Sequence, residues 1–222
     1  NKLISDLYPF IGNAFRIGIT GPPGAGKSTL TDNLINLFRN ADKKVGVIVV
    51  DPTSPFTGGA LLGDRVRMIT HYDDPGVYIR SMASRGNQGG LAEKTREAGD
   101  LLDAAGYDVI LFETVGVGQV ELDVIQTTDT VVVILVPESG DDIQMMKAGL
   151  MEIGDIFVIN KSDREGADKL DIAIRQLFSI TPRREEDWEI PIIKTIATQN
   201  IKIDILFEFI LKHQKFTSDA GI

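Results

Sequence analysis

The sequence predicts a doubly wound α/β domain, in which a mostly parallel sheet carries helices on both faces. Short runs of β-branched and apolar residues recur along the chain with helical patterns between them. Runs that are apolar on both faces are typical of strands covered by helices on either side. A length of 222 residues suits one domain with a sizeable core, so we treat residues 1–222 as a single domain. In such a sheet we expect ligands at the carboxyl ends of the strands.

The expected strands are the apolar runs at residues 15–20, 44–50, 76–80, 107–113, 130–136, 155–160 and 189–195. Apolar residues at helical spacing predict helices at residues 27–40, 62–71, 91–105, 143–153, 165–178 and 203–214. The long apolar run VVVILV, residues 131–136, is too short for a membrane span and suits a buried strand. The alternation of strands with helices is what a parallel sheet requires.

Composition disfavours several classes of function. The formal net charge of -9 argues against a nucleic-acid-binding surface and against binding to an anionic membrane. The chain has no cysteine and only two histidines, which excludes disulfides and thiolate metal sites and disfavours an imidazole-rich zinc or nickel site. The opening NKLISDLYPF contains an acid and a proline where a signal peptide needs an apolar core. We expect a soluble cytoplasmic protein, or one of the mitochondrial matrix if the chain is eukaryotic.

The first expected strand leads into GPPGAGKST, which fits G-x-x-x-x-G-K-[ST], the phosphate-cradling loop of nucleotide-binding proteins. Glycines let backbone N–H groups turn inward around an anion, and the N-terminus of the next helix adds partial positive charge. Lys27 is expected on the β- and γ-phosphates as a catalytic group, and the Ser28 hydroxyl on Mg²⁺. A plain turn explains the glycines but not the lysine. The predicted nucleotide-binding residues of this loop are Gly21, Gly24, Ala25, Gly26, Lys27, Ser28 and Thr29.

Three acidic residues lie at or beyond the ends of expected strands. Asp51 follows the second strand, Asp64 lies in the glycine-punctuated loop beyond it, and Glu113 ends the fourth strand. Each acid alone is an ordinary turn, cap or helix-face residue. Together with Ser28, they predict a Mg²⁺ site, because Mg²⁺ prefers carboxylate oxygens, hydroxyls and water.

A nucleotide switch is predicted directly after the fourth strand, where Glu113 and Gly116 occupy the places of an Asp-x-x-Gly motif. The N–H of Gly116 can sense a γ-phosphate and release when it departs. A glycine-rich turn would explain the glycine but not an acid placed last on a buried run. Glu113 is therefore a catalytic as well as a metal candidate, and Gln119 is the candidate for orienting the attacking water.

The sixth expected strand ends in an Asn-Lys-x-Asp motif, formed by Asn160, Lys161 and Asp163. An Asp carboxylate accepts from both N1–H and the exocyclic amino group of guanine, a donor pair that adenine lacks. Lys161 can lay its stem along the base, Asn160 can brace the loop, and Ala197 is expected to donate its N–H to the guanine oxygen. The two motifs together predict a GTPase, with GTP and GDP as substrate and product and Mg²⁺ as cofactor.

The chain resembles the GTPases that accompany methylmalonyl-CoA mutase, the MeaB/ArgK type, within the larger class of metal-insertion and signal-recognition GTPases. The resemblance is carried by GPPGAGKSTL, VDPTSPFTGGALLGDRVRM, RSMASRGNQGGLA, ETVGVGQVELDV and PESGDDIQMMKAGLMEIGDIFVINKSDREGA. It implies a G-protein chaperone for an adenosylcobalamin-dependent methylmalonyl-CoA mutase or a related acyl-CoA mutase, which gates cofactor loading and protects that enzyme.

The resemblance also implies roles for single residues. It puts Asp64 beside Ser28 at Mg²⁺ in the active state, and Asp51 and Glu113 in the inner or outer shell of that ion. A third mobile loop, which changes with the nucleotide and faces the mutase, would contain Asp141 and Lys147. From the residues alone, an ordinary helix-surface lysine is the preferred interpretation of Lys147.

Two features concern oligomerisation. Pro22 stands where dimeric relatives carry a second lysine, so catalysis is not expected to depend on a neighbouring subunit's lysine. Family members also have an N-terminal helical region and a C-terminal dimer arm, both largely absent here. A homodimer is therefore expected only of a full-length protein.

Three other functions remain open on the residues. A kinase or transport-associated ATPase is one, against which Asp163 argues. A nickel-insertion GTPase is the second, disfavoured by the lack of cysteine and scarcity of histidine. The third is a nucleotide-bound scaffold with negligible turnover.

Overall fold

A single sheet organises the chain. The computed structural model describes residues 7–51, 69–71, 73–83, 91–116, 118–137, 150–180 and 188–221. Across these ranges seven strands form one sheet in the order β3-β2-β4-β1-β5-β6-β7, and every neighbouring pair is parallel. The predicted doubly wound α/β class is confirmed, with a described sheet that is parallel throughout.

The strands lie close to their expected positions. They are β1 Phe15–Thr20, β2 Val45–Asp51, β3 Val77–Ala83, β4 Val109–Thr114, β5 Thr130–Leu135, β6 Ile156–Ile159 and β7 Ile192–Lys194. Strand β3 runs further than expected and β7 is shorter. Strands β4, β5 and β6 are buried along their whole length, as expected for runs that are apolar on both faces.

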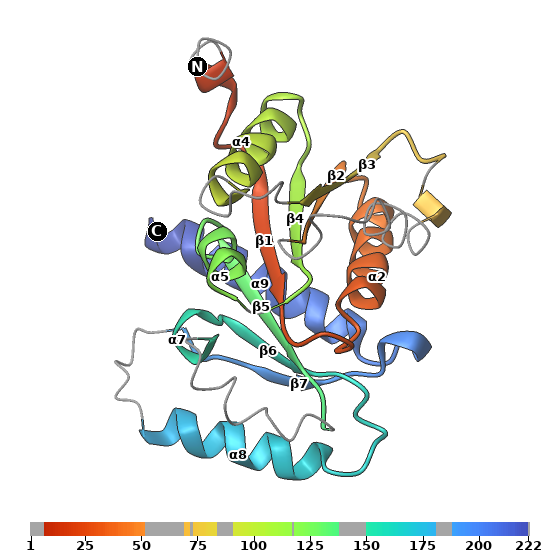
Figure 1. The fold of residues 1–222 in the computed structure, drawn as a ribbon, viewed down its shortest axis with the longest axis vertical. Helices are drawn as coiled ribbons and strands as arrows, with labels where there is room; N and C mark the ends of the chain where they lie inside the picture. The colour runs from red at the N-terminus through yellow and green to blue at the C-terminus, as the bar shows by residue number, and fades with distance from the viewer. Residues whose placement is uncertain are drawn as a thin grey trace.

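Helices cover both faces of this sheet (Figure 1). The α-helices are α2 Lys27–Asn40, α4 Leu91–Ala104, α5 Gln119–Ile125, α7 Met151–Ile153, α8 Ala167–Ile180 and α9 Ile203–Ala220. Short 3-10 helices are η1 Tyr8–Phe10, η2 Ile69–His71 and η5 Ala197–Gln199. No helix in the described part of the chain is long and apolar enough to cross a bilayer.

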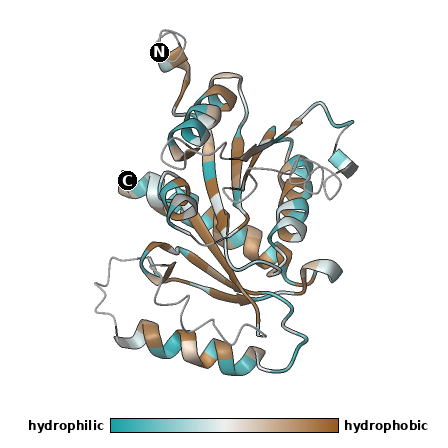
Figure 2. Ribbon diagram, viewed as in Figure 1, coloured by the Kyte–Doolittle hydropathy of each residue, from teal (hydrophilic) through white to brown (hydrophobic). Residues whose placement is uncertain are grey.

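Alternate residues of each strand feed two separate cores. Val109 and Leu111 of β4 join α2 and α9 on one face, whereas Ile110 and Phe112 join α4, α5 and α8 on the other. This is the two-residue period of a strand. Figure 2 shows the central strands coloured as hydrophobic, while the helices carry both hydrophobic and hydrophilic stripes.

Several helix boundaries differ from the sequence prediction. The last helix was expected to end at residue 214 but continues to Ala220, because Phe216 on its extra turns packs against the Trp188 ring at 5.5 Å between centroids. Helix α5 was not predicted, since it is only seven residues long. Of the expected helices at residues 62–71 and 143–153, only the last turns, η2 and α7, fall within the described residues.

The order of the strands fixes where a ligand can bind. Strands β2, β3 and β4 lie on one side of β1 in the sheet, whereas β5, β6 and β7 lie on its other side. The chain changes sides when it passes from β4 to β5. A reversal of this kind opens a crevice at the carboxyl ends of the strands next to it. The loops that leave β1, β4 and β6 all meet there.

Candidate functional site

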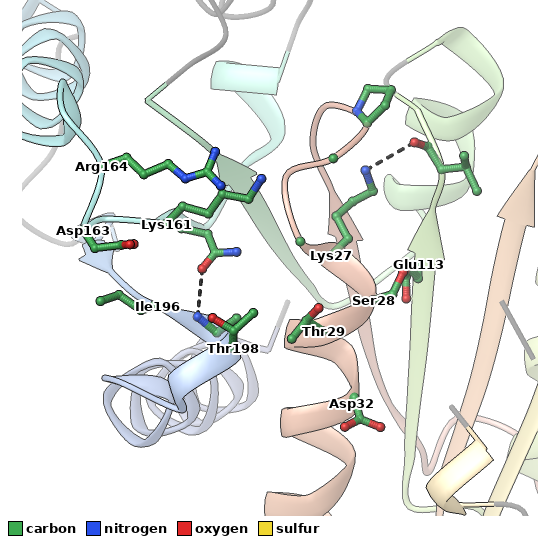
Figure 3. Close-up of a pocket in the computed structure, with 16 residues that line it drawn as sticks. Lys27, Ser28, Thr29, Asp32, Glu113, Lys161, Asp163, Arg164, Ile196 and Thr198 are labelled. Carbon is green, nitrogen blue, oxygen red and sulfur yellow. Dashed lines mark hydrogen bonds between the residues drawn. The ribbon is translucent and has the colours of Figure 1, made fainter. Parts of the chain in front are cut away.

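A cavity of about 720 Å³ lies at the carboxyl ends of β1, β4 and β6 (Figure 3). It gathers residues that are far apart in the sequence, as a ligand-binding crevice of this fold requires. The described residues that line it are Pro23, Gly24, Gly26, Lys27, Ser28, Thr29, Asp32, Glu113, Val115, Asn160, Lys161, Asp163, Arg164, Ile196, Ala197 and Thr198.

The loop between β1 and α2 needs glycine at two places. Gly21 has a φ of 145°, and an added Cβ would overlap the carbonyl oxygen of Ile134. Gly26 is the N-cap of α2 with a φ of 91°, and its Cβ would overlap the side-chain amide of Asn160. The loop can therefore fold tightly over the start of α2, whose N-terminus presents backbone N–H groups and partial positive charge to the cavity.

Lys27 is held inside this loop although it is charged. Its side chain is only 6% exposed, and Nζ donates to the carbonyls of Gly21 at 2.7 Å and Pro22 at 2.8 Å. A third bond of 3.2 Å reaches the carbonyl of Val115, just beyond β4 (Figure 3). The ammonium group thus sits at the centre of the loop that the sequence assigns to phosphate binding, and links that loop to the predicted switch.

Ser28 and Glu113 form the pair that the sequence assigns to Mg²⁺. Ser28 Oγ donates to Glu113 Oε1 at 2.6 Å, and Glu113 is 3% exposed at the end of β4. Two adjacent ligands of an octahedral Mg²⁺ lie about 2.9 Å apart, given Mg–O distances of 2.0–2.1 Å. A small opening of this pair would therefore admit the ion between two hard oxygen ligands, so the residues fit Mg²⁺.

The side chains of the other two predicted metal ligands, Asp51 and Asp64, are not described by the structure. Asp51 ends β2, in the strand next to β4, but the placement of its side chain lies outside what the structure describes. Asp64 also lies outside the described residues. Within the described part of the chain, no three His, Cys, Asp or Glu side chains converge on one point. Of the four predicted metal ligands, Ser28 and Glu113 are therefore the two whose side chains the structure describes at the cavity.

Asn160 braces the far end of the cavity against the phosphate loop. It is 3% exposed, and Nδ2 donates to the carbonyl of Ala25 at 2.8 Å. Its Oδ1 accepts from the N–H of Ala197 at 3.0 Å and from Thr195 Oγ1 at 3.2 Å. Asn160 thus links the phosphate loop to the loop after β7, and its role at a nucleotide stays a prediction. The N–H of Ala197, which the sequence assigns to the guanine oxygen, is bonded to Asn160 here, and that assignment stays a prediction.

The remaining residues of this motif line the wall opposite the phosphate loop. Figure 3 shows Lys161, Asp163 and Arg164 across the cavity from Lys27. Lys161 adopts a left-handed backbone with a φ of 56°, which turns the chain sharply after β6. One cavity therefore has a phosphate-binding end and an end with a carboxylate at the position expected for reading a base.

Gln119 is not placed at the cavity. It is exposed as the first residue of α5, and its side-chain amide donates to Asp123 Oδ1 at 2.8 Å. It is absent from the described residues that line the cavity. Asp141 and Lys147, assigned to a partner-responsive loop, lie outside the described residues.

Sequence reasoning missed several lining residues. Asp32 lies one helical turn after Ser28 on α2, a spacing that places both on one face and could have indicated it. Its Oδ1 lies 2.8 Å from His71 Nε2 and accepts from Thr70 Oγ1 at 3.3 Å. Arg164 follows the base-reading motif directly. Ile196 and Thr198, which flank Ala197, carried no signal of their own.

The sequence of the whole chain places it among known proteins. The family described as methylmalonyl-CoA mutase-associated GTPase MeaB matches residues 1–222. The chain belongs to this family. The resemblance stated from the motifs and the enzyme class predicted from them, a GTPase, are thereby confirmed.

Individual relatives agree with this membership. A Pyrococcus abyssi protein named as a GTPase is 55% identical over 99% of this chain and 68% of its own length. The GTPase ArgK of Escherichia coli is 38% identical over 99% of this chain and 67% of its own length. The mitochondrial methylmalonic aciduria type A homolog of Mus musculus is 38% identical over 92% of this chain and 50% of its own length.

Solved structures agree on the fold. The crystal structure of a protein named LAO/AO transport system kinase has a TM-score of 0.77 and 30% identity, with 99% of this chain and 65% of that chain covered. This chain therefore spans less than two thirds of that protein. HypB from Helicobacter pylori, solved with nickel, has a TM-score of 0.58 at 17% identity, with 96% of this chain and 92% of that chain covered, which supports the fold alone.

Proposed function

We propose that this MeaB-family chain binds GTP in the cavity and hydrolyses it with Mg²⁺ bound. We propose further that it serves as a G-protein chaperone for an adenosylcobalamin-dependent methylmalonyl-CoA mutase or a related acyl-CoA mutase. The observation that carries the first part is that one cavity joins Lys27 and a phosphate loop to Asp163 at the opposite wall. The family description and the name of the mouse relative support the second part.

Nucleotide binding would draw on groups already positioned. The N-terminus of α2 lies at the cavity, and Lys27 would exchange carbonyl acceptors for phosphate oxygens. At the other wall, the acceptor-only carboxylate of Asp163 would match the two donors of guanine. Asn160 keeps the two ends at a fixed separation, because it bonds to both loops.

Hydrolysis would rest on positioning and charge neutralisation. Mg²⁺, when bound, neutralises charge that develops on the β- and γ-phosphate oxygens. Ser28 and Glu113 would hold it, with Asp51 and Asp64 as the further proposed ligands, while Lys27 stabilises the transferred group. Gln119 remains the proposed residue for orienting water. For that role its side chain would have to leave the bond to Asp123 and turn toward the cavity.

The proposed partner is tested by GTP turnover with and without an adenosylcobalamin-dependent methylmalonyl-CoA mutase. Stimulated turnover is expected, with Asp141 and Lys147 in the loop that responds to the partner. Turnover that stays negligible with the mutase present would favour the scaffold alternative. We further propose that a homodimer belongs to the full-length protein and that the chain acts in the cytoplasm, or in the mitochondrial matrix of a eukaryote.

The kinase or ATPase alternative has one supporting observation, the name of the transport system kinase whose structure is similar. Calorimetric titration with GDP and ADP separates the two functions. A site in which a carboxylate accepts two hydrogen bonds from guanine should bind GDP about a hundredfold or more tightly than ADP. Equal affinities would favour the alternative. Nickel insertion gains no support, because the likeness to HypB shows the fold alone.

A further inference from the structure

Two threonines connect the phosphate loop to the predicted switch beneath the cavity. Thr20 ends β1 and Thr114 ends β4, and these two strands are paired in parallel with Ile19 opposite Glu113. Both threonines are fully buried, at 0% exposure. Their hydroxyl oxygens lie 3.1 Å apart. A hydroxyl pair at this place joins the residue before the phosphate loop to the residue after Glu113.

The hydroxyl of Thr114 has one proton and three neighbouring acceptor oxygens, one of which is Thr20 Oγ1 at 3.1 Å. Thr114 Oγ1 also lies 3.0 Å from the carbonyl of Gly116 and 3.4 Å from the carbonyl of Ile19. A hydroxyl donates one bond and accepts up to two. The shortest of the three distances assigns the proton to Gly116, and with that assignment the contact between the two threonines requires the hydroxyl of Thr20 as donor. The chain of bonds then runs from Thr20 through Thr114 to Gly116.

Lys27 restrains the same segment from the other side. Its bond to the carbonyl of Val115 is 3.2 Å long, against 2.7 Å and 2.8 Å to the two loop carbonyls. Lys27 therefore ties the carbonyl of Val115 directly to the phosphate loop, whereas the carbonyl of Gly116 is tied to it only through Thr114 and Thr20. A phosphate oxygen that competes for Nζ would displace the longest of these bonds most easily.

We propose that Thr114 is a positioning residue that sets the preference of the site between GTP and GDP. This inference rests on the proposed function. In the arrangement seen here its hydroxyl holds the carbonyl of Gly116. When a γ-phosphate attracts the N–H of Gly116 and Lys27 releases Val115, the hydroxyl rotates to the carbonyl of Ile19. The buried hydroxyl keeps an acceptor in both arrangements, so the change leaves no buried donor unpaired.

The direction of the effect follows from the two distances. The bond to Gly116 is the shorter of the two, so the hydroxyl favours the arrangement seen here over the one that a γ-phosphate would induce. Thr114→Val keeps the shape of the side chain and removes the hydroxyl. It should raise the ratio of affinities for a non-hydrolysable GTP analogue over GDP by about twofold to threefold, because only the difference between a 3.0 Å and a 3.4 Å bond is lost, which is a fraction of one net hydrogen bond.

The experiment measures both affinities by calorimetry for wild type and three variants. Thr114→Ser retains the hydroxyl and should keep the wild-type ratio. Thr95→Val is the matched control for a buried hydroxyl, because Thr95 is 0% exposed and bonds only within α4, to the carbonyl of Leu91 at 2.8 Å among the bonds described. It should lower the melting temperature without changing the ratio. If Thr114→Val does not fold, the same affinities are measured on the double variant Thr114→Val with Thr20→Val, which removes both hydroxyls of the pair.

The outcomes separate this inference from the proposed function. If wild type does not prefer GDP to ADP, the guanine-nucleotide function fails. If it does, and the ratio in Thr114→Val equals the wild-type ratio or Thr95→Val shifts it equally, then Thr114 is a packing residue only and the inference is overturned.

Discussion

Replacement of Asn160 by alanine should loosen both ends of the nucleotide site at once. The substitution removes bonds to the carbonyl of Ala25, the N–H of Ala197 and the hydroxyl of Thr195. Asn160 and Ala197 are 3% and 4% exposed, so water cannot readily replace the lost partner. An unpaired buried donor costs about 1–3 kcal/mol, and the lost bond to Ala25 adds about 1 kcal/mol. The hydroxyl of Thr195 can turn to another acceptor.

We therefore expect Asn160→Ala to lower the free energy of unfolding by about 2–4 kcal/mol, measured by urea denaturation. GDP affinity should also fall, because Asn160 holds the phosphate loop and the base-reading loop together. Asn36→Ala is the matched control. Its amide is exposed and donates only within α2 among the bonds described, to the carbonyl of Asp32 at 3.0 Å. A loss below about 0.5 kcal/mol for Asn160→Ala, no larger than that of the control, would refute the reasoning.

Three further predictions follow from the site and the fold. Lys27→Ala should leave a folded protein by circular dichroism but greatly weaken GTP binding or turnover, and an unchanged rate would contradict the phosphate-loop assignment. Lys147→Ala should reduce mutase-stimulated GTP turnover more than intrinsic turnover, whereas equal fractional effects would make it an ordinary surface lysine. Burial lowers the pKa of His213 to about 4 and raises that of Asp155 to about 6. On acidification from pH 6.5 to 4, His213 binds a proton more readily in the unfolded chain than in the folded one, so it lowers the free energy of unfolding. Asp155 has the opposite effect, because its carboxylate binds a proton more readily in the folded chain. Asp155→Asn should therefore steepen the loss of stability over that range, and urea midpoints at several pH values measure it.

The sequence predicted those parts of the molecule that depend on local pattern. The strands and the phosphate loop follow from apolar periodicity and from the spacing of glycines around Lys27, both of which are local properties. Glu113 and Asp163 were found because each stands at or just beyond the end of an apolar run. Parallel strands bring those ends to one edge of the sheet, so local reasoning was enough to gather them into one site.

The features that were missed depend on contacts between distant segments. The turns added to α9 are stabilised by Trp188, whose ring lies 4.8 Å from that of His213 and 5.5 Å from that of Phe216, a contact that no pattern within the helix indicates. The link between Thr20 and Thr114 requires the register of β1 on β4. Likewise, the carbonyl partners of Lys27 are backbone atoms, which carry no residue-specific signal.

The most direct test of the guanine-nucleotide site is the nucleotide preference of Asp163→Asn. The carboxylate of Asp163 only accepts hydrogen bonds and so matches the two donors of guanine, whereas an amide offers one acceptor and one donor group. Facing the guanine amino group, the new NH₂ would leave buried donors unpaired at a cost of about 1–3 kcal/mol or more. Xanthine carries a carbonyl in place of that amino group and keeps N1–H, so it complements the amide. The variant should lose GTP and gain XTP as a substrate. If it retains the wild-type preference for GTP over XTP, Asp163 does not read the base and the assignment of this site to guanine is wrong.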